Sequence, residues 1–76
     1  MIKRSITLEG HKTSLALEAE FWLALEEIAA DSKLSIPALV AKIDQQRKTG
    51  NLSSALRIFA LEYFTKKNVS QDQNNP

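Results

Sequence analysis

The amino-acid sequence predicts a small, mainly α-helical domain that begins with a short β-ribbon. Two observations indicate this fold class. Apolar and polar residues alternate through residues 2–17, as they do in strands with one buried face. From Phe21 onward the apolar residues instead recur at steps of three and four, which is the spacing of amphipathic helices. The chain has 76 residues, so we expect a single domain.

The first predicted strand covers residues 2–8, with the sequence IKRSITL. Its alternation separates two faces, which are Ile6 with Leu8 and Ser5 with Thr7. Glu9-Gly10 follows and is a tight turn, a bulge or a break in the strand. This dipeptide is a weaker hairpin signal than Asn-Gly, so the sequence leaves the three alternatives open.

The second predicted strand covers residues 12–17, and no turn residue separates it from the helix that follows. The outward residues are Lys12, Ser14 and Ala16, and the inward residues include Leu15 and Leu17. The backbone of a strand needs a ladder partner, and its apolar side needs a cover. The partner is either residues 2–8 of the same chain or the same strand of a second chain, paired across a two-fold axis.

Two amphipathic helices come next. The first runs from about residue 19 to residue 32, and its apolar stripe includes Trp22. The second begins after Ser35, which is the predicted N-cap, and continues to about Arg47. Its apolar stripe includes Leu39 and Ile43.

A third helix is predicted after a break at Gly50 and Asn51, where glycine suits a helix C-cap and asparagine an N-cap. This helix runs from about residue 52 to residue 66. Residues 68–76 are polar with little to bury, so we expect a disordered tail. Residues 1–67 then form the folded domain.

Composition excludes several kinds of site. The chain has no cysteine and a single histidine, His11, so disulfides are excluded and a zinc or iron–sulfur site lacks ligands. We therefore expect no metal and no cofactor. No catalytic nucleophile or phosphate-binding loop is visible, so we do not expect an enzyme. The sequence also contains no run of about 18 apolar residues and no signal-peptide pattern, which predicts a cytoplasmic protein.

The size of the chain predicts a partner. A domain this small buries only about 60% of the surface that its unfolded chain exposes, and its stability alone is marginal. Small domains compensate with disulfides, metals or a partner chain, and only the last remains here. The apolar content of 43% is high for such a chain and indicates a face that is covered on assembly.

Charge is unevenly distributed although the net charge is only +1. Lys3, Arg4, His11 and Lys12 lie within the N-terminal segment, where Glu9 is the only acid. The first helix that follows is acidic. The N-terminal segment is therefore a basic patch.

Residues 12–43 resemble the ribbon-helix-helix (MetJ/Arc-like) family of dimeric bacterial DNA-binding proteins. The resemblance consists of a short alternating strand (TSLALE), immediate entry into an amphipathic helix (AEFWLALEEIAADSK), Leu34, and a second helix that begins at a serine (SIPALVAKID). With KRSITLEGHKTS in front and NLSSALRIFALEYF behind, the whole chain is similar to a subgroup of short bacterial proteins in that family.

The resemblance implies an intertwined homodimer with an extra C-terminal helix. It also implies that the protein regulates transcription. A β-ribbon enters the DNA major groove in such proteins, and the base-facing residues here are Lys12, Ser14 and Ala16. Backbone N–H groups at Ser35 and Ile36 are expected to bind a phosphate. Lys3 and Arg4 either reach flanking phosphates or are ordinary solubilising charges.

The expected dimer core consists of Leu15, Leu17, Trp22, Leu39 and Ile43. If residues 2–8 pair with the ribbon's outer edge, the sheet becomes four strands wide and does not fit a major groove without bending or moving aside. An alternative function keeps the dimer but uses its surface to bind a protein, as an antitoxin-like module with weak or no DNA binding. The near-neutral charge and the third helix favour that alternative.

Overall fold

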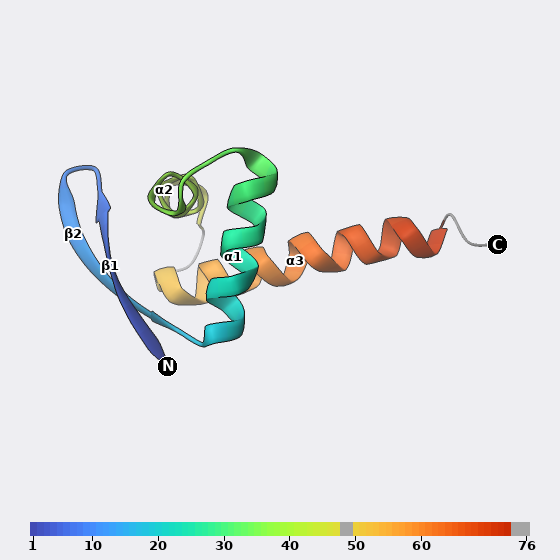
Figure 1. Cartoon of the computed structure of the whole chain (residues 1–76), viewed down its shortest axis with the longest axis horizontal. Helices are drawn as coiled ribbons and strands as arrows, with labels where there is room; N and C mark the ends of the chain where they lie inside the picture. Colours follow the sequence, from blue (N-terminus) through green and yellow to red (C-terminus); the bar gives the residue numbers. More distant parts are fainter. Residues whose placement is uncertain (48–49, 74–76) are drawn as a thin grey trace.

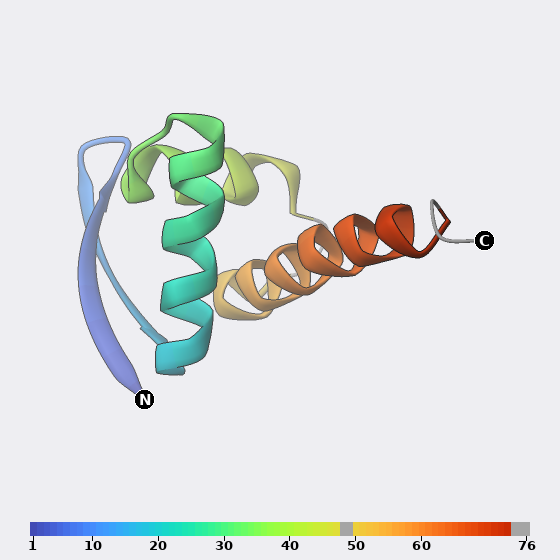
Figure 2. The same cartoon turned by 45° about the vertical axis from the view of Figure 1, so that its right-hand side comes forward.

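The chain folds into a two-stranded antiparallel hairpin followed by three helices. The computed structural model describes residues 1–47 and 50–73, with side chains described as far as Lys66. The elements are β1 (Ile2–Leu8), β2 (His11–Leu17), α1 (Ala19–Ser32), α2 (Ile36–Gln46) and α3 (Leu52–Gln73). The helices lie on one side of the curved hairpin, and α3 projects away from it (Figure 1; Figure 2). The predicted fold class of a short β-ribbon with mainly helical structure is confirmed within the single chain.

The two strands pair with each other in a fixed antiparallel register, from Ile2 opposite Leu17 to Leu8 opposite His11. The connection is a two-residue turn, in which Glu9 has φ 50° and Gly10 has φ 84°. Two positive φ angles in succession define the type I′ turn, whose twist matches that of the flanking strands. Of the alternatives left open by the sequence, the tight turn is therefore the one adopted, and residues 2–8 are the ladder partner of β2.

The passage from β2 to α1 takes a single residue, Glu18. Its backbone is still extended, and its carbonyl oxygen already accepts hydrogen bonds from the amides of Phe21 and Trp22, at 3.0 and 3.2 Å. An N-cap residue combines these two properties. β2 ends at Leu17, and the next residue, Glu18, is already the N-cap of α1. The strand therefore passes into the helix without a turn.

The inner face of the hairpin and the apolar stripes of the helices form one core within a single chain. Its buried members are Ile6, Leu8, Leu15, Leu17, Trp22, Leu25, Ile28, Ala29, Leu39, Val40, Ile43, Leu56 and Ala60. All five residues expected in a dimer core belong to this set, so their burial is complete without a second chain. Their contribution to an intertwined dimer stays a prediction.

The first two helices end and begin as the sequence predicts. α1 occupies the expected residues 19–32 and stops at Lys33, which adopts the left-handed conformation and donates its amide back to Ala30. Ser35 caps α2, because its Oγ accepts a hydrogen bond from the amide of Ala38 at 3.2 Å. Asn51 caps α3 in the same way, with its Oδ1 accepting from the amide of Ser54 at 3.1 Å.

α3 is longer than the sequence predicts. It continues to Gln73, so residues 68–73, which the sequence predicts as part of a tail, belong to this helix in the structure. The segment contains no glycine or proline, and a helix that is already formed extends at one hydrogen bond per added residue. Residues 74–76, also predicted as tail, lie outside the described residues. The C-terminal half of α3 extends past the other elements (Figure 2).

Candidate nucleic-acid interface

The face of the hairpin that points away from the helices is open to solvent in the described chain (Figure 1). It consists of three cross-strand pairs, which are Lys3 with Ala16, Ser5 with Ser14 and Thr7 with Lys12. We call these residues the outer face. All are exposed except Ala16, which is half-buried. The three residues predicted to face bases therefore lie together, and β1 places three more side chains directly opposite them.

The charge of the outer face is positive. Lys3 is on β1 and Lys12 is on β2, at diagonally opposite corners and four residues apart in register, which is roughly 13 Å along the strands. Within the described chain, no acidic side chain belongs to this face. Glu9 lies at the turn, where its Oε1 is 3.5 Å from the amide nitrogen of Gln45 on α2. The outer face thus offers two cations and several hydroxyl groups to a polyanion.

Arg4 does not lie on the outer face. Its guanidinium group stacks on the indole ring of Trp22, 4.6 Å from the ring centroid, and its Nη1 is 3.0 Å from Oε2 of Glu26 on α1. Trp22 also holds β1 directly, because its Nε1–H donates a hydrogen bond to the carbonyl oxygen of Ile2 at 2.8 Å. The structure therefore engages Arg4 in fixing β1 to α1, and only Lys3 of the predicted pair of flanking cations points outward.

The predicted phosphate-binding residues occur at the start of α2. Ser35 is exposed, and its side chain is occupied by the cap to Ala38. Ile36 packs partly against the core. Pro37 at the start of the helix has no N–H group. This end of α2 therefore presents a positive helix dipole with few backbone donors to an anion.

An ion pair connects the end of the hairpin to α3. The guanidinium of Arg57 donates from Nε and Nη2 to the two carboxylate oxygens of Glu18, at 2.9 and 3.3 Å. These hydrogen bonds from Arg57 hold the pKa of Glu18 below its ordinary value. The guanidinium also lies 6.0 Å from the centroid of the Phe21 ring. The two-point contact joins α3 to the strand-to-helix junction at a partly exposed position.

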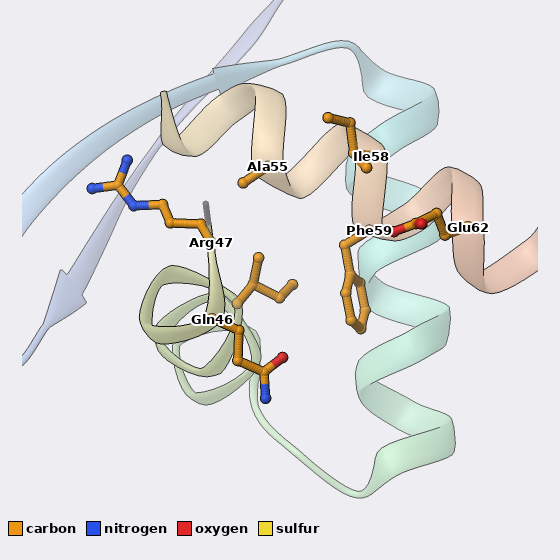
Figure 3. A pocket seen from close by; sticks show the side chains of 7 residues that line it. Gln46, Arg47, Ala55, Ile58, Phe59 and Glu62 are labelled. Atoms are coloured by element: carbon orange, nitrogen blue, oxygen red, sulfur yellow. The ribbon is translucent and has the colours of Figure 1, made fainter. Parts of the chain in front are cut away.

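A shallow hollow lies between the end of α2 and the middle of α3. It has a volume of about 360 Å³, and Figure 3 shows Phe59 directed from α3 into the space beside α2. Ile58 and Ala55 line the α3 side, while Arg47 and Glu62 lie at its edges. Beside the hollow, Leu61 of α3 is 65% exposed. This surface is apolar and lies on the helices, away from the hairpin's outer face.

The chain was compared with known proteins. A family described as the ribbon-helix-helix domain matches residues 1–64, and this match extends over the hairpin, α1, α2 and more than half of α3. The chain belongs to the ribbon-helix-helix family. Ribbon-helix-helix domains generally bind DNA as dimers. No curated protein and no solved structure matched.

The described residues contain neither a metal-binding cluster nor a membrane-spanning helix. No group of three histidine, cysteine, aspartate or glutamate side chains is placed to hold a metal ion. None of the described helices combines the length and the apolar character that crossing a membrane requires.

Sequence reasoning did not include Ser5 and Thr7 among the candidate site residues. The signal was present, because both alternate with the apolar Ile6 and Leu8 and so had to point away from the core. The same alternation places Arg4 on the inner side with Ile6. The sequence did not show which strand pairs with β2. That pairing decides whether β1 lies beside Lys12, Ser14 and Ala16, the residues predicted to face bases.

Proposed function

We propose that this ribbon-helix-helix protein binds DNA sequence-specifically, as a homodimer, and regulates transcription. The observation that supports the proposal is the outer face of the hairpin, which is exposed, basic and free of acidic side chains within the described chain. A two-stranded antiparallel ribbon is narrow enough to enter the major groove. Lys12 and Ser14 supply hydrogen-bonding groups for base edges, and Ala16 supplies an apolar contact for a thymine methyl group.

Two features support a dimer. The edge of β2 opposite β1 has no strand partner in the described chain, so its backbone groups remain open to pairing with another copy. Large apolar side chains are also exposed on the helices, with Leu23 on α1 and Leu61 on α3 each 65% exposed. Exposed apolar side chains and an open strand edge are the features that association covers.

Selection of binding sites from random duplex DNA with the purified protein tests the proposal. Binding of the selected duplex, followed by fluorescence anisotropy, is expected to be about a thousandfold or more tighter than binding of a scrambled duplex. Affinity should fall as salt rises, because Lys3 and Lys12 displace counterions. Sedimentation of the free protein should show a dimer. Equal affinity for all duplexes, or none, refutes sequence-specific binding, and a folded monomer at all concentrations refutes the dimer.

A second candidate function is a protein-interaction module of the antitoxin-like kind. The hollow between α2 and α3, with Ile58 at its edge and Leu61 beside it, favours this function because an apolar hollow on helices suits another protein better than DNA. Replacing Ile58, which lines the hollow, by Asp separates the two functions. DNA binding through the hairpin should be unchanged in this variant, whereas a protein partner of α3 should be lost.

A further inference from the structure

One surface of α3 is apolar although nothing in the described chain covers it. Ile58 and Leu61 are large apolar residues, yet they are 49% and 65% exposed. They lie on the side of α3 opposite Leu56 and Ala60, which are buried in the core. Residues three apart are neighbours on a helix surface, so Ile58 and Leu61 form one patch. A patch of this kind is covered when a protein associates with a partner.

The patch belongs to a longer row of uncharged residues that has the spacing of a helix–helix seam. Ser54 precedes Ile58 by four residues, and Thr65 follows Leu61 by four. Steps of four, three and four residues are those at which one long helix packs its side chains against another. We call this row, Ser54, Ile58, Leu61 and Thr65, the outer stripe. The charged residues of α3 as far as residue 66 all lie off it, namely Arg57, Glu62 and Lys66. The outer stripe therefore fits an apolar helix face and not a nucleic acid.

The helix of this protein that matches the outer stripe is α3 itself. α3 has 22 residues and is about 33 Å long, whereas α1 has 14 residues and α2 has 11. α1 and α2 contact α3 from its inner side, and the C-terminal half of α3 extends past them (Figure 2). The outer stripe is therefore accessible to a second long helix. A second copy of the chain supplies one with the same length and the same spacing of uncharged residues.

The outer stripe is self-complementary when two copies of α3 run in opposite directions. A two-fold axis midway between Ile58 and Leu61 places each of them opposite the other residue in the second copy. The same axis places Ser54 opposite Thr65. The large apolar side chains then meet in the middle of the seam, and the small ones meet at its ends. Opposed helix macrodipoles also favour this direction over the parallel one.

The charges beside the outer stripe agree with the antiparallel direction. In that arrangement Glu62 of one copy lies opposite Ala55 of the other. Ala55 lines the hollow between α2 and α3, and Arg47 lies at the edge of the same hollow (Figure 3). The carboxylate of Glu62 therefore approaches the guanidinium of Arg47 in the second copy. On the other flank of the stripe, Arg57 lies opposite the aromatic ring of Phe64. Opposite charges thus meet and like charges do not, which fixes the register of an interface.

We propose that the outer stripe of α3 packs antiparallel against the outer stripe of a second copy. This inference goes beyond the proposed DNA-binding function and does not depend on it, because the outer stripe lies on α3 and the outer face lies on the hairpin. The seam contains two large apolar side chains from each copy, so it buries much less area than a standard interface of about 1,600 Å². Its association is therefore weak. Pairs of chains joined through their β2 edges associate further only at concentrations near about 1 mM.

Sedimentation equilibrium of the full-length chain over a range of concentrations tests the seam. The weight-average mass of wild type should rise in a step that doubles the assembly as the concentration approaches about 1 mM. Leu61→Asp places a carboxylate in the seam and should weaken this step by about tenfold or more. Ala38→Asp is the matched control, because it adds the same charge at an exposed site on α2 and should leave the step unchanged.

The result separates this inference from the dimer proposed above. With paired β2 edges the step joins dimers into tetramers, and without them it joins monomers into dimers, so its loss in Leu61→Asp supports the seam in either case. A mass for wild type that does not rise with concentration overturns the inference. The same rise for wild type and Leu61→Asp overturns it as well.

Disulfide cross-linking tests the direction of the seam. The chain has no cysteine, so each single substitution reports one position. Ile58→Cys and Leu61→Cys chains, one of them isotopically labelled, are mixed and oxidised at high concentration. The mixed disulfide should exceed both like-with-like products, because Ile58 lies opposite Leu61 in the antiparallel seam. Lys42→Cys on α2 is the control and should cross-link slowly with either chain. A mixed disulfide that forms no faster than the Lys42→Cys products, or an excess of like-with-like products, overturns the antiparallel seam.

Discussion

The guanidinium group of Arg4 lies over the indole ring of Trp22, with 4.6 Å between its central carbon and the ring centroid. Arg4 belongs to β1 and Trp22 to α1, so this contact attaches the first strand to the first helix. The ion pair from Arg4 to Glu26 adds little, because the two side chains are 39% and 43% exposed and water screens their attraction. The stacking on Trp22 is therefore the larger part of the contact.

Replacing Arg4 by Met is predicted to destabilise the fold. The variant keeps an unbranched side chain over the ring but loses the cation, so the free energy of unfolding should fall by about 1 kcal/mol. Urea unfolding at neutral pH measures the change. Lys3→Met is the control, because it makes a similar change on the outer face and should alter stability by less than about 0.5 kcal/mol. Equal losses in the two variants would show that the stacked position of Arg4 contributes nothing.

Gly10 is predicted to be essential to the turn. Its φ of 84° lies in the left-handed region, and a Cβ at this position would meet no atom within 4 Å, so the cost of a side chain is backbone strain alone. Gly10→Ala should therefore lower the free energy of unfolding by about 1–2 kcal/mol. Gly50→Ala is the matched control. Gly50 also has open space around it but lies outside that φ region, so its replacement should have a much smaller effect in the same urea titration.

The helices were predictable because their signals are local. An apolar stripe, a serine at the start of α2 and an asparagine at the start of α3 each act on neighbouring backbone groups, and Ser35 and Asn51 cap the helices as expected. The start of α1 is also set locally. The carbonyl oxygen of Glu18, the residue directly after β2, accepts the first hydrogen bonds of the helix from Phe21 and Trp22. Such boundaries depend on a few adjacent residues and not on the rest of the fold.

The ladder partner of β2 was not predictable, because pairing within the chain and pairing between chains satisfy the same alternation. Glu9 is an unusual residue for a positive φ, so the turn signal was weak where it mattered most. The position of Arg4 depends on the same pairing, because Arg4 reaches Trp22 of α1 only when β1 lies beside β2. This contact joins residues that are far apart in the sequence, so no local signal indicates it. The extension of α3 was missed for another reason: residues 68–73 carry no apolar stripe, and their helix depends on continuation from the preceding turns.

The ion pair between Glu18 and Arg57 is predicted to make stability depend on pH. Hydrogen bonds from Arg57 lower the pKa of Glu18 from its ordinary value of 4.5. A lowered pKa in the folded state means that the contribution is fully present above the ordinary pKa. It is lost as pH falls through the folded-state pKa, when the carboxylate is protonated. Glu18→Gln should therefore be less stable than wild type at neutral pH.

The difference between wild type and Glu18→Gln should shrink as pH falls below 4.5 and through the lowered pKa of Glu18 in the folded state. Urea unfolding midpoints measured at neutral pH and at stepwise lower pH give the comparison, since protonation removes the charge that distinguishes the two proteins. Glu62→Gln on α3 is the control, because Glu62 is exposed and changes the same charge without the Arg57 contact. A difference that stays constant across this pH range would mean that the carboxylate charge is not what stabilises the junction.

The approach of α2 to DNA is tested by adding a cation to its first turn. Ile36 is unsuited to this because it packs partly against the core, whereas Ala38 is exposed. If the start of α2 contacts a phosphate, the Ala38→Lys variant should bind a selected duplex more tightly at low salt. Its salt slope should be steeper by about one, because the added lysine releases one more counterion.

Thr65→Lys on α3 makes the same change of charge at an exposed site of another helix and should leave the slope unaltered. Anisotropy titrations of both variants across a salt series decide the matter. An unchanged affinity and slope for Ala38→Lys would show that α2 does not approach DNA, and the hairpin would then bind without a phosphate contact from this helix.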